Sequence, residues 1–157
     1  TAFAATPQVR QEDENLALFV AQQITQRGFT HYEISNFGTY QSRHNKGYWE
    51  LKEYIGAGAG AVGYRKNRRY YPQTDIEAYL HAPLKCAEER LDEEALRTER
   101  LFLGLRCNLG LPKQILTDPM HQRAAFLCSE QKLKEDATHY YNPNFFLSDE
   151  LALYILG

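Results

Sequence analysis

HYEISNFGTYQSRHNKGYWELKEYIGAGAGAVGYR, residues 31–65, combines a short strand-like alternation, a cluster of aromatic and histidine residues, and a glycine-rich segment. Apolar and more polar residues alternate over Phe29–Phe37, which predicts a short strand. Before it, apolar residues recur at helical spacing over Asp13–Arg27 and Gly28 follows, which predicts an amphipathic helix. A helix that leads into a strand is typical of an α/β unit.

The middle of this stretch has no clean periodicity, so residues 40–53 are predicted to form a structured loop with about one helical turn. The loop contains His44, Asn45, Tyr48 and Trp49. A helical turn brings Tyr48 beside His44, because side chains four residues apart are neighbours on a helix. Imidazole can ligate a metal or a haem iron, and a flat aromatic neighbour suits a porphyrin face. The same residues also fit an aromatic cluster in which a hydrogen-bonded histidine holds the loop. The other four histidines have no companions in the sequence.

Glycines recur at positions 56, 58, 60 and 63 of the segment YIGAGAGAVGY, residues 54–64. Their missing side chains permit close approach of a ligand or of a neighbouring strand. The spacing is too tight for a dinucleotide-binding loop, and a predicted strand follows it instead of a helix. The basic run RKNRR, residues 65–69, predicts a hairpin turn, and its charges also suit the carboxylates of a ligand. Thr74 is then predicted to cap a short helix.

A shift in charge near Pro83 predicts a boundary between two parts of the chain. Residues 1–82 carry nine basic and eight acidic side chains, whereas residues 83–157 carry nine and twelve. The second part is predicted to be mostly helical with one small hairpin, which resembles a winged-helix arrangement. Helices are predicted from Asp92, Pro112, Pro119 and Ser148, and the hairpin is predicted to pair residues 133–138 with residues 145–147. The acidic balance argues against nucleic-acid binding, which needs a basic stripe for phosphates.

Composition narrows the class of protein further. The 157 residues carry a formal net charge of -2, so no overall field draws the chain onto nucleic acid or an anionic membrane. No apolar run approaches the roughly 20 residues of a membrane span and no secretion signal is visible, so we expect a cytoplasmic protein. Because the chain starts at Thr1 without a methionine, we expect a piece of a longer protein.

The three cysteines do not form a recognisable site in the sequence. Cys86, Cys107 and Cys128 are odd in number and stand 21 residues apart, which matches neither a disulfide framework nor a metal knuckle. We therefore expect reduced thiols that pack as small apolar side chains. No nucleophile with an evident base, paired carboxylates or phosphate loop stands out either.

Residues 31–65 closely resemble the HemW and HemN family of radical S-adenosylmethionine proteins, and the resemblance extends more loosely over ERLFLGLR at 99–106 and FFLSDELALYILG at 145–157. The family contains oxygen-independent coproporphyrinogen III oxidase and the HemW haem chaperones. HNKGYW at 44–49 resembles the HNxxYW motif of the chaperone branch, where it is implicated in haem binding.

The resemblance implies roles for individual residues. It makes His44 a haem contact or an axial ligand of the haem iron, in a pocket shaped by Asn45, Tyr48 and Trp49. It also brings the segment that contains Gly56, Gly58 and Gly60 near S-adenosylmethionine. The family's CxxxCxxC motif, which binds a [4Fe-4S] cluster, has no counterpart in this sequence. We therefore expect this chain alone not to be catalytic, while its parent carries the cluster and S-adenosyl-L-methionine.

The resemblance also implies a fold and a function. Residues 1–82 would supply the last elements of a partial (β/α) barrel, and residues 83–157 a mostly helical, winged-helix-like C-terminal domain. The expected function is that of a chaperone that binds haem and transfers it to acceptor proteins. The alternative is the oxidase, which decarboxylates propionates in haem biosynthesis by radical chemistry. A barrel strand without its neighbours leaves an open edge, so we also expect a homodimer through that edge.

Overall fold

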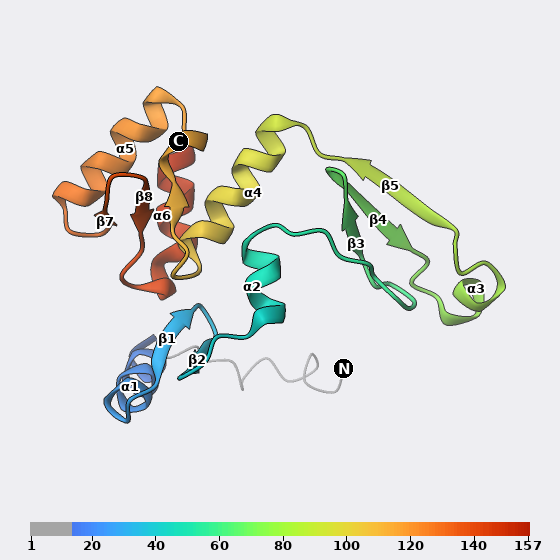
Figure 1. Ribbon diagram of the computed structural model, residues 1–157, viewed down its shortest axis with the longest axis horizontal. Coiled ribbons are helices and arrows are strands. Elements are labelled where there is room, and N and C mark those ends of the chain that lie inside the picture. Colours follow the sequence, from blue (N-terminus) through green and yellow to red (C-terminus); the bar gives the residue numbers. More distant parts are fainter. Residues whose placement is uncertain (1–13) are drawn as a thin grey trace. The chain divides into compact units, whose positions relative to one another are not determined.

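A computed structural model of the chain describes residues 14–157, which form parts of two compact units, residues 1–41 and residues 42–157 (Figure 1). The predicted start of the first helix at Asp13 lies outside the described residues. The predicted boundary at residue 82 concerns the domains of the whole protein and stays a prediction. None of the helices in the described residues is both long and apolar enough to cross a membrane.

The first unit contains helix α1 (Glu14–Gln26) and a hairpin of β1 (Thr30–Glu33) and β2 (Asn36–Gly38). The helix ends at Gln26, one residue before the predicted Arg27, and Gly28 follows as predicted, with a φ of 89° in the left-handed region that glycine adopts easily. The prediction of one strand over Phe29–Phe37 is wrong, because the chain turns between the two short strands.

The side chain of Glu33 explains this turn. Its carboxylate accepts hydrogen bonds from Ser35 Oγ, at 3.4 Å, and from Asn36 Nδ2. The Glu33 side chain is buried, so these two donors satisfy a carboxylate that has little access to water. These bonds join side chains on the two sides of the turn, so they stabilise it where alternation predicts an extended strand.

The second unit begins with helix α2 (Arg43–Trp49) and an antiparallel sheet in the order β3-β4-β5. The predicted hairpin is confirmed, with β3 (Gly63–Arg65) and β4 (Arg68–Pro72) joined by Lys66 and Asn67, whose φ angles of 51° and 58° are those of a two-residue hairpin turn. Helix α3 (Ile76–His81) leads to β5 (Cys86–Arg90), which the sequence did not predict.

The cap of α3 differs by one residue from the prediction. Asp75, not Thr74, precedes the helix, and its carboxylate accepts a hydrogen bond from Ala78 N at 2.8 Å. Aspartate is as good a cap as threonine, so the sequence allows either choice. The correction moves the helix by one position and leaves its existence as predicted.

The main core lies among α4 (Glu93–Leu105), α5 (Asp118–Ser129) and α6 (Ser148–Leu156). Helix α4 begins as predicted at Asp92, whose carboxylate accepts a hydrogen bond from Ala95 N at 2.8 Å. Figure 1 shows α4 leading from the first sheet into the helical core. The buried residues of this core are Leu101, Leu105, Leu111, Ala124, Leu127, Leu133, Tyr140, Leu151, Ala152 and Ile155.

A second sheet, in the order β6-β8-β7, flanks these helices and differs from the predicted hairpin. Its strands are β6 (Leu111–Pro112), β7 (Lys134–Glu135) and β8 (His139–Tyr141). The predicted pairing of residues 133–138 with 145–147 is wrong, because Asp136 closes a tighter turn by accepting hydrogen bonds from Thr138 N and His139 N at 2.7 and 2.8 Å.

Two further predictions in this half need correction. Pro112 precedes only a single 3-10 turn, Lys113–Ile115, and residues 145–147 form another. Ser148 is the first residue of α6, so it does not precede the helix as its cap. Its hydroxyl donates a hydrogen bond to Phe145 O at 2.7 Å. The predicted set of helices with a small antiparallel sheet is otherwise present.

Candidate functional site

Helix α2 carries all four residues of the predicted haem-binding motif. It begins after Ser42, whose Oγ accepts a hydrogen bond from Asn45 N at 3.2 Å, as a serine cap normally does. The chain leaves the helix through Leu51, which has a φ of 53°. The motif therefore forms about two helical turns, by the usual 3.6 residues per turn, and not the single turn predicted.

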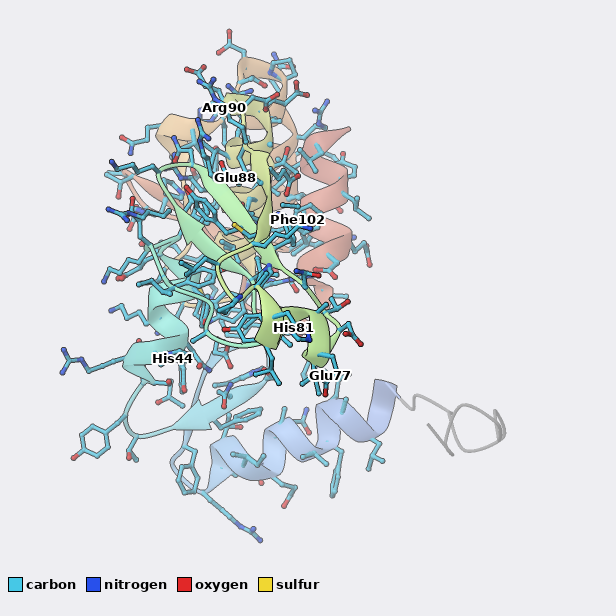
Figure 2. All side chains as sticks on the ribbon, turned by 90° about the vertical axis from the view of Figure 1, so that its right-hand side faces the viewer. His44, Glu77, His81, Glu88, Arg90 and Phe102 are labelled. Atoms are coloured by element: carbon cyan, nitrogen blue, oxygen red, sulfur yellow. The ribbon has the colours of Figure 1, made fainter. Side chains whose placement is uncertain are left out.

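His44 and Tyr48 lie against each other on the solvent-exposed, outer side of α2. Their ring centroids are 5.0 Å apart and the ring planes meet at 85°, an edge-to-face contact. This neighbourhood is the one that helical spacing predicts. Both side chains are exposed, so an edge of the imidazole remains open to a ligand. Figure 2 shows His44 on α2, apart from the labelled Phe102 on α4.

Two tyrosines that the sequence analysis missed connect this pair to the interior. The Tyr48 and Tyr54 rings are 4.7 Å apart at 68°, and those of Tyr54 and Tyr64 are 6.2 Å apart. The backbones of Tyr54 and Tyr64 exchange two hydrogen bonds of 2.8 and 2.9 Å. Burial raises the pKa of both phenols, which keeps them neutral. In the sequence, only the place of Tyr54 and Tyr64 in an aromatic-rich stretch indicates that they belong with this pair.

Trp49 has different surroundings from His44. Five residues turn a helix by about 140° beyond one full turn, so the indole points away from the outer side. It lines a cavity of about 290 Å³ together with Arg100 of α4 and His139 of β8. His139 has no companion in the sequence, and only the packing of distant elements brings it here. The Trp49 Nε1 atom is buried without a hydrogen-bond acceptor in the described structure.

Close packing of the backbone requires at least one glycine of the glycine-rich segment. A Cβ at Gly56 would lie 1.9 Å from Ala61 O, so the two backbone stretches are in contact and leave no room for a side chain. Gly58 and Gly60 have φ angles of 126° and 70°, which glycine adopts without strain. These features account for the three residues as parts of a tight loop, and their contact with S-adenosylmethionine stays a prediction.

The basic hairpin turn is largely neutralised by carboxylates of the same chain. Arg68 pairs with Glu88 at 2.8 Å, and Arg69 pairs with Glu99. Arg65 lies 3.9 Å from a carboxylate oxygen of Glu53. These pairs favour the hairpin-turn interpretation over ligand binding.

The described residues do not fit an iron-sulfur cluster. Within residues 14–157, no three side chains among histidine, cysteine, aspartate and glutamate come together as a metal site. Cys86 is exposed, Cys107 is buried and Cys128 is half-buried, and these three residues form no disulfide with one another. Burial raises the pKa of Cys128.

Comparison with known proteins finds several relatives that share one name. No protein-family model matches the chain. The heme chaperone HemW of Lactococcus lactis is 34% identical over 154 residues, which cover 92% of this chain and 38% of that protein. The heme chaperone HemW of Synechocystis is 38% identical over 97 residues, with coverages of 56% and 24%, and that of Bacillus subtilis is 34% identical over 113 residues, with coverages of 67% and 30%. The chain thus spans less than two fifths of these relatives.

Among solved structures, coproporphyrinogen III oxidase (HemN) from Escherichia coli, described as a radical SAM enzyme, has a TM-score of 0.66 to this chain. The likeness covers 98% of this chain and 44% of that structure at 12% sequence identity. Such low identity shows the fold alone. The predicted fold class is confirmed: elements of a partial radical-SAM barrel followed by a mostly helical, winged-helix-like domain.

Proposed function

The chain belongs to the HemW and HemN family of radical S-adenosylmethionine proteins, and from this premise we propose that it binds haem through α2, as part of a protein that passes haem to acceptor proteins. Family membership implies S-adenosylmethionine and a [4Fe-4S] cluster in the whole protein. The relatives named as heme chaperones support the chaperone function. A cytoplasmic location belongs to the same proposal.

One observation carries the proposal: the exposed imidazole of His44 against the edge-on ring of Tyr48. A haem ligand must present a ring nitrogen that the iron can reach, and exposure provides that access. The aromatic ring fixes the orientation of the imidazole and offers an apolar surface to the macrocycle. Asn45, from the same helix, is proposed to shape the side of this site, whereas the Trp49 indole points away from it into the cavity.

The aromatic series behind the pair supports a fixed site. Tyr48 packs on Tyr54, and Tyr54 is joined to Tyr64 by two backbone hydrogen bonds. Tyr64 is buried with Leu91 and Leu96 in a small apolar cluster. Because the outer face of α2 is anchored to this cluster, little conformational entropy is lost when a ligand binds.

The oxidase alternative has support from the fold only. Its structural relative is 12% identical, whereas the sequence relatives at 34–38% identity are named chaperones. The chaperone function is therefore the better supported of the two.

A haem titration of the chain under reducing conditions, followed by Soret absorbance, tests the proposal. We expect saturable binding, and at least about tenfold weaker binding by His44→Ala, about 1.4 kcal/mol, because the iron loses a ligand. His81→Ala is the control, since His81 is an exposed histidine on α3. Equal affinities of wild type and His44→Ala would overturn the ligand assignment, and no saturable binding by wild type would overturn haem binding.

A further inference from the structure

Helix α2 contains one glycine that neither its conformation nor its packing requires. Gly47 lies inside the helix, where glycine is less stable than alanine. It is not among the residues with a positive φ, so its backbone would accept a side chain. Apart from its chain neighbours and the backbone of its own helix, no described atom lies within 4 Å of the place that a Cβ would take.

Two other glycines of the second unit have a structural reason that Gly47 lacks. A Cβ at Gly56 would lie 1.9 Å from Ala61 O, and one at Gly104 would lie 2.7 Å from Gly110 O. At Gly47 the missing side chain instead leaves the helix backbone open to the outside. Bare backbone of this kind permits the close approach of a ligand, which a residue with a side chain would prevent.

The bare backbone at Gly47 lies beside the candidate haem ligand. Four positions on the surface of α2 fall within about 140°, at about 100° per residue, and they are Arg43, Gly47, His44 and Tyr48. Arg43 and His44 stand four and three residues before Gly47, so both are its direct neighbours on the helix surface. The side chains of Arg43, His44 and Tyr48 are exposed. A flat ligand held at His44 therefore reaches Gly47 without passing around the helix.

The charges on this side of α2 favour an acidic group at the end where Arg43 lies. Within residues 14–157, no carboxylate forms an ion pair with Arg43. The acid in the same row is Glu50, seven residues or about 10 Å farther along the helix axis. It pairs with Lys52. A carboxylate at the edge of a ligand is therefore attracted to Arg43, whose guanidinium offers it two parallel N–H groups.

We propose that the carboxylate-bearing edge of the tetrapyrrole lies on the bare backbone at Gly47, with a carboxylate on Arg43 and the iron at His44. This inference rests on the proposed function and adds to it the orientation of the ligand on α2. A side chain at position 47 would stand under this edge and hold the macrocycle away from the helix. Glycine at this position lowers the stability of the helix and permits close contact with a flat ligand.

Gly47→Leu separates this contact from any effect on folding. We expect at least about tenfold weaker haem binding in the Soret titration, because the new side chain takes the place of the ligand edge. Its melting temperature should be no lower than that of wild type, since leucine favours a helix and its Cβ meets no neighbour here. Lys46→Leu is the matched control. It adds leucine about 160° around the helix from His44, and it should bind haem as wild type does.

Haem and its dimethyl ester, in which both carboxylates are blocked, test the contact with Arg43. We expect wild type to bind haem at least about threefold more tightly than the ester, the scale of an exposed ion pair. Arg43→Gln should abolish this preference, whereas Lys46→Gln, which also removes one charge from α2, should retain it. His44→Ala should weaken both ligands and leave their ratio unchanged.

The outcomes separate this surface from haem binding itself. If Gly47→Leu binds haem as tightly as wild type, or melts at a lower temperature, the role of Gly47 is wrong and haem binding at His44 stands. If wild type binds haem and ester equally, or Arg43→Gln keeps the preference, the contact with Arg43 is wrong. If wild type binds neither haem nor ester, this inference and the proposed function both fail.

Discussion

At the scale of single residues, the candidate site divides into a part that the sequence predicts and a part that it does not. The contact of His44 with Tyr48 follows from helical spacing and is present as predicted. Arg100 and His139 join Trp49 only because α4 and β8 pack beside α2. Such a contact depends on tertiary structure, for which spacing along one chain carries no signal.

Glycines 47 and 56 give a matched test of packing at this scale. A Cβ at Gly56 would overlap the backbone of Ala61, whereas a Cβ at Gly47, inside α2, would meet nothing within 4 Å. We expect Gly56→Ala to lower the free energy of unfolding by about 1–3 kcal/mol, through overpacking. Gly47→Ala should raise it by about 0.5–1 kcal/mol, because alanine favours a helix. Urea denaturation measures both.

At the scale of elements, predictions succeeded where capping and periodicity agree. Helix α4 has Asp92 as its cap and an apolar stripe, and it was predicted within one residue. Strand β5 was missed because CAEER is exposed on both faces and has no apolar alternation. Its partner strand determines it instead, through pairs such as Arg68 with Glu88. Local turns of Glu33 and Asp136 likewise overrode longer predicted strands.

The junction between α4 and the segment after β8 depends on a buried amide. Asn142 Nδ2 donates to Leu105 O at 2.9 Å, and its Oδ1 accepts from Asn144 N at 2.9 Å. We expect Asn142→Ala to cost about 1–3 kcal/mol of stability, because a buried carbonyl at the end of α4 loses its donor. Thermal unfolding measures this, with the exposed Asn108→Ala as control. Equal melting temperatures for the two variants would contradict this role of the amide.

At the scale of the whole molecule, the chain covers only part of its relatives. It spans 38% of the Lactococcus lactis relative and 44% of the structural neighbour. Helix α1 has apolar side chains on the surface, and Phe19 is 56% exposed. The short hairpin beside it in sequence also has only two strands. Both features favour packing of these elements against a further partner.

We expect the isolated chain to form dimers at high concentration through this first unit, as the open barrel edge predicts. Sedimentation velocity over a hundredfold concentration range measures the association. Phe19→Glu should reduce the association constant at least about tenfold, because a charge on the apolar face opposes its burial. Leu84→Glu is the control, since Leu84 is more exposed still but belongs to the second unit. A chain that stays monomeric throughout would contradict this prediction.

Strand β5 has one more consequence, which concerns fibril formation. It is the last strand of its sheet, and a free strand edge is a template on which other chains can stack without limit. Glu88, Glu89 and Arg90 occupy consecutive, exposed positions there. A second copy added in register would stack each of these charges on its like. We therefore expect the charges of this strand to oppose amyloid growth at this edge.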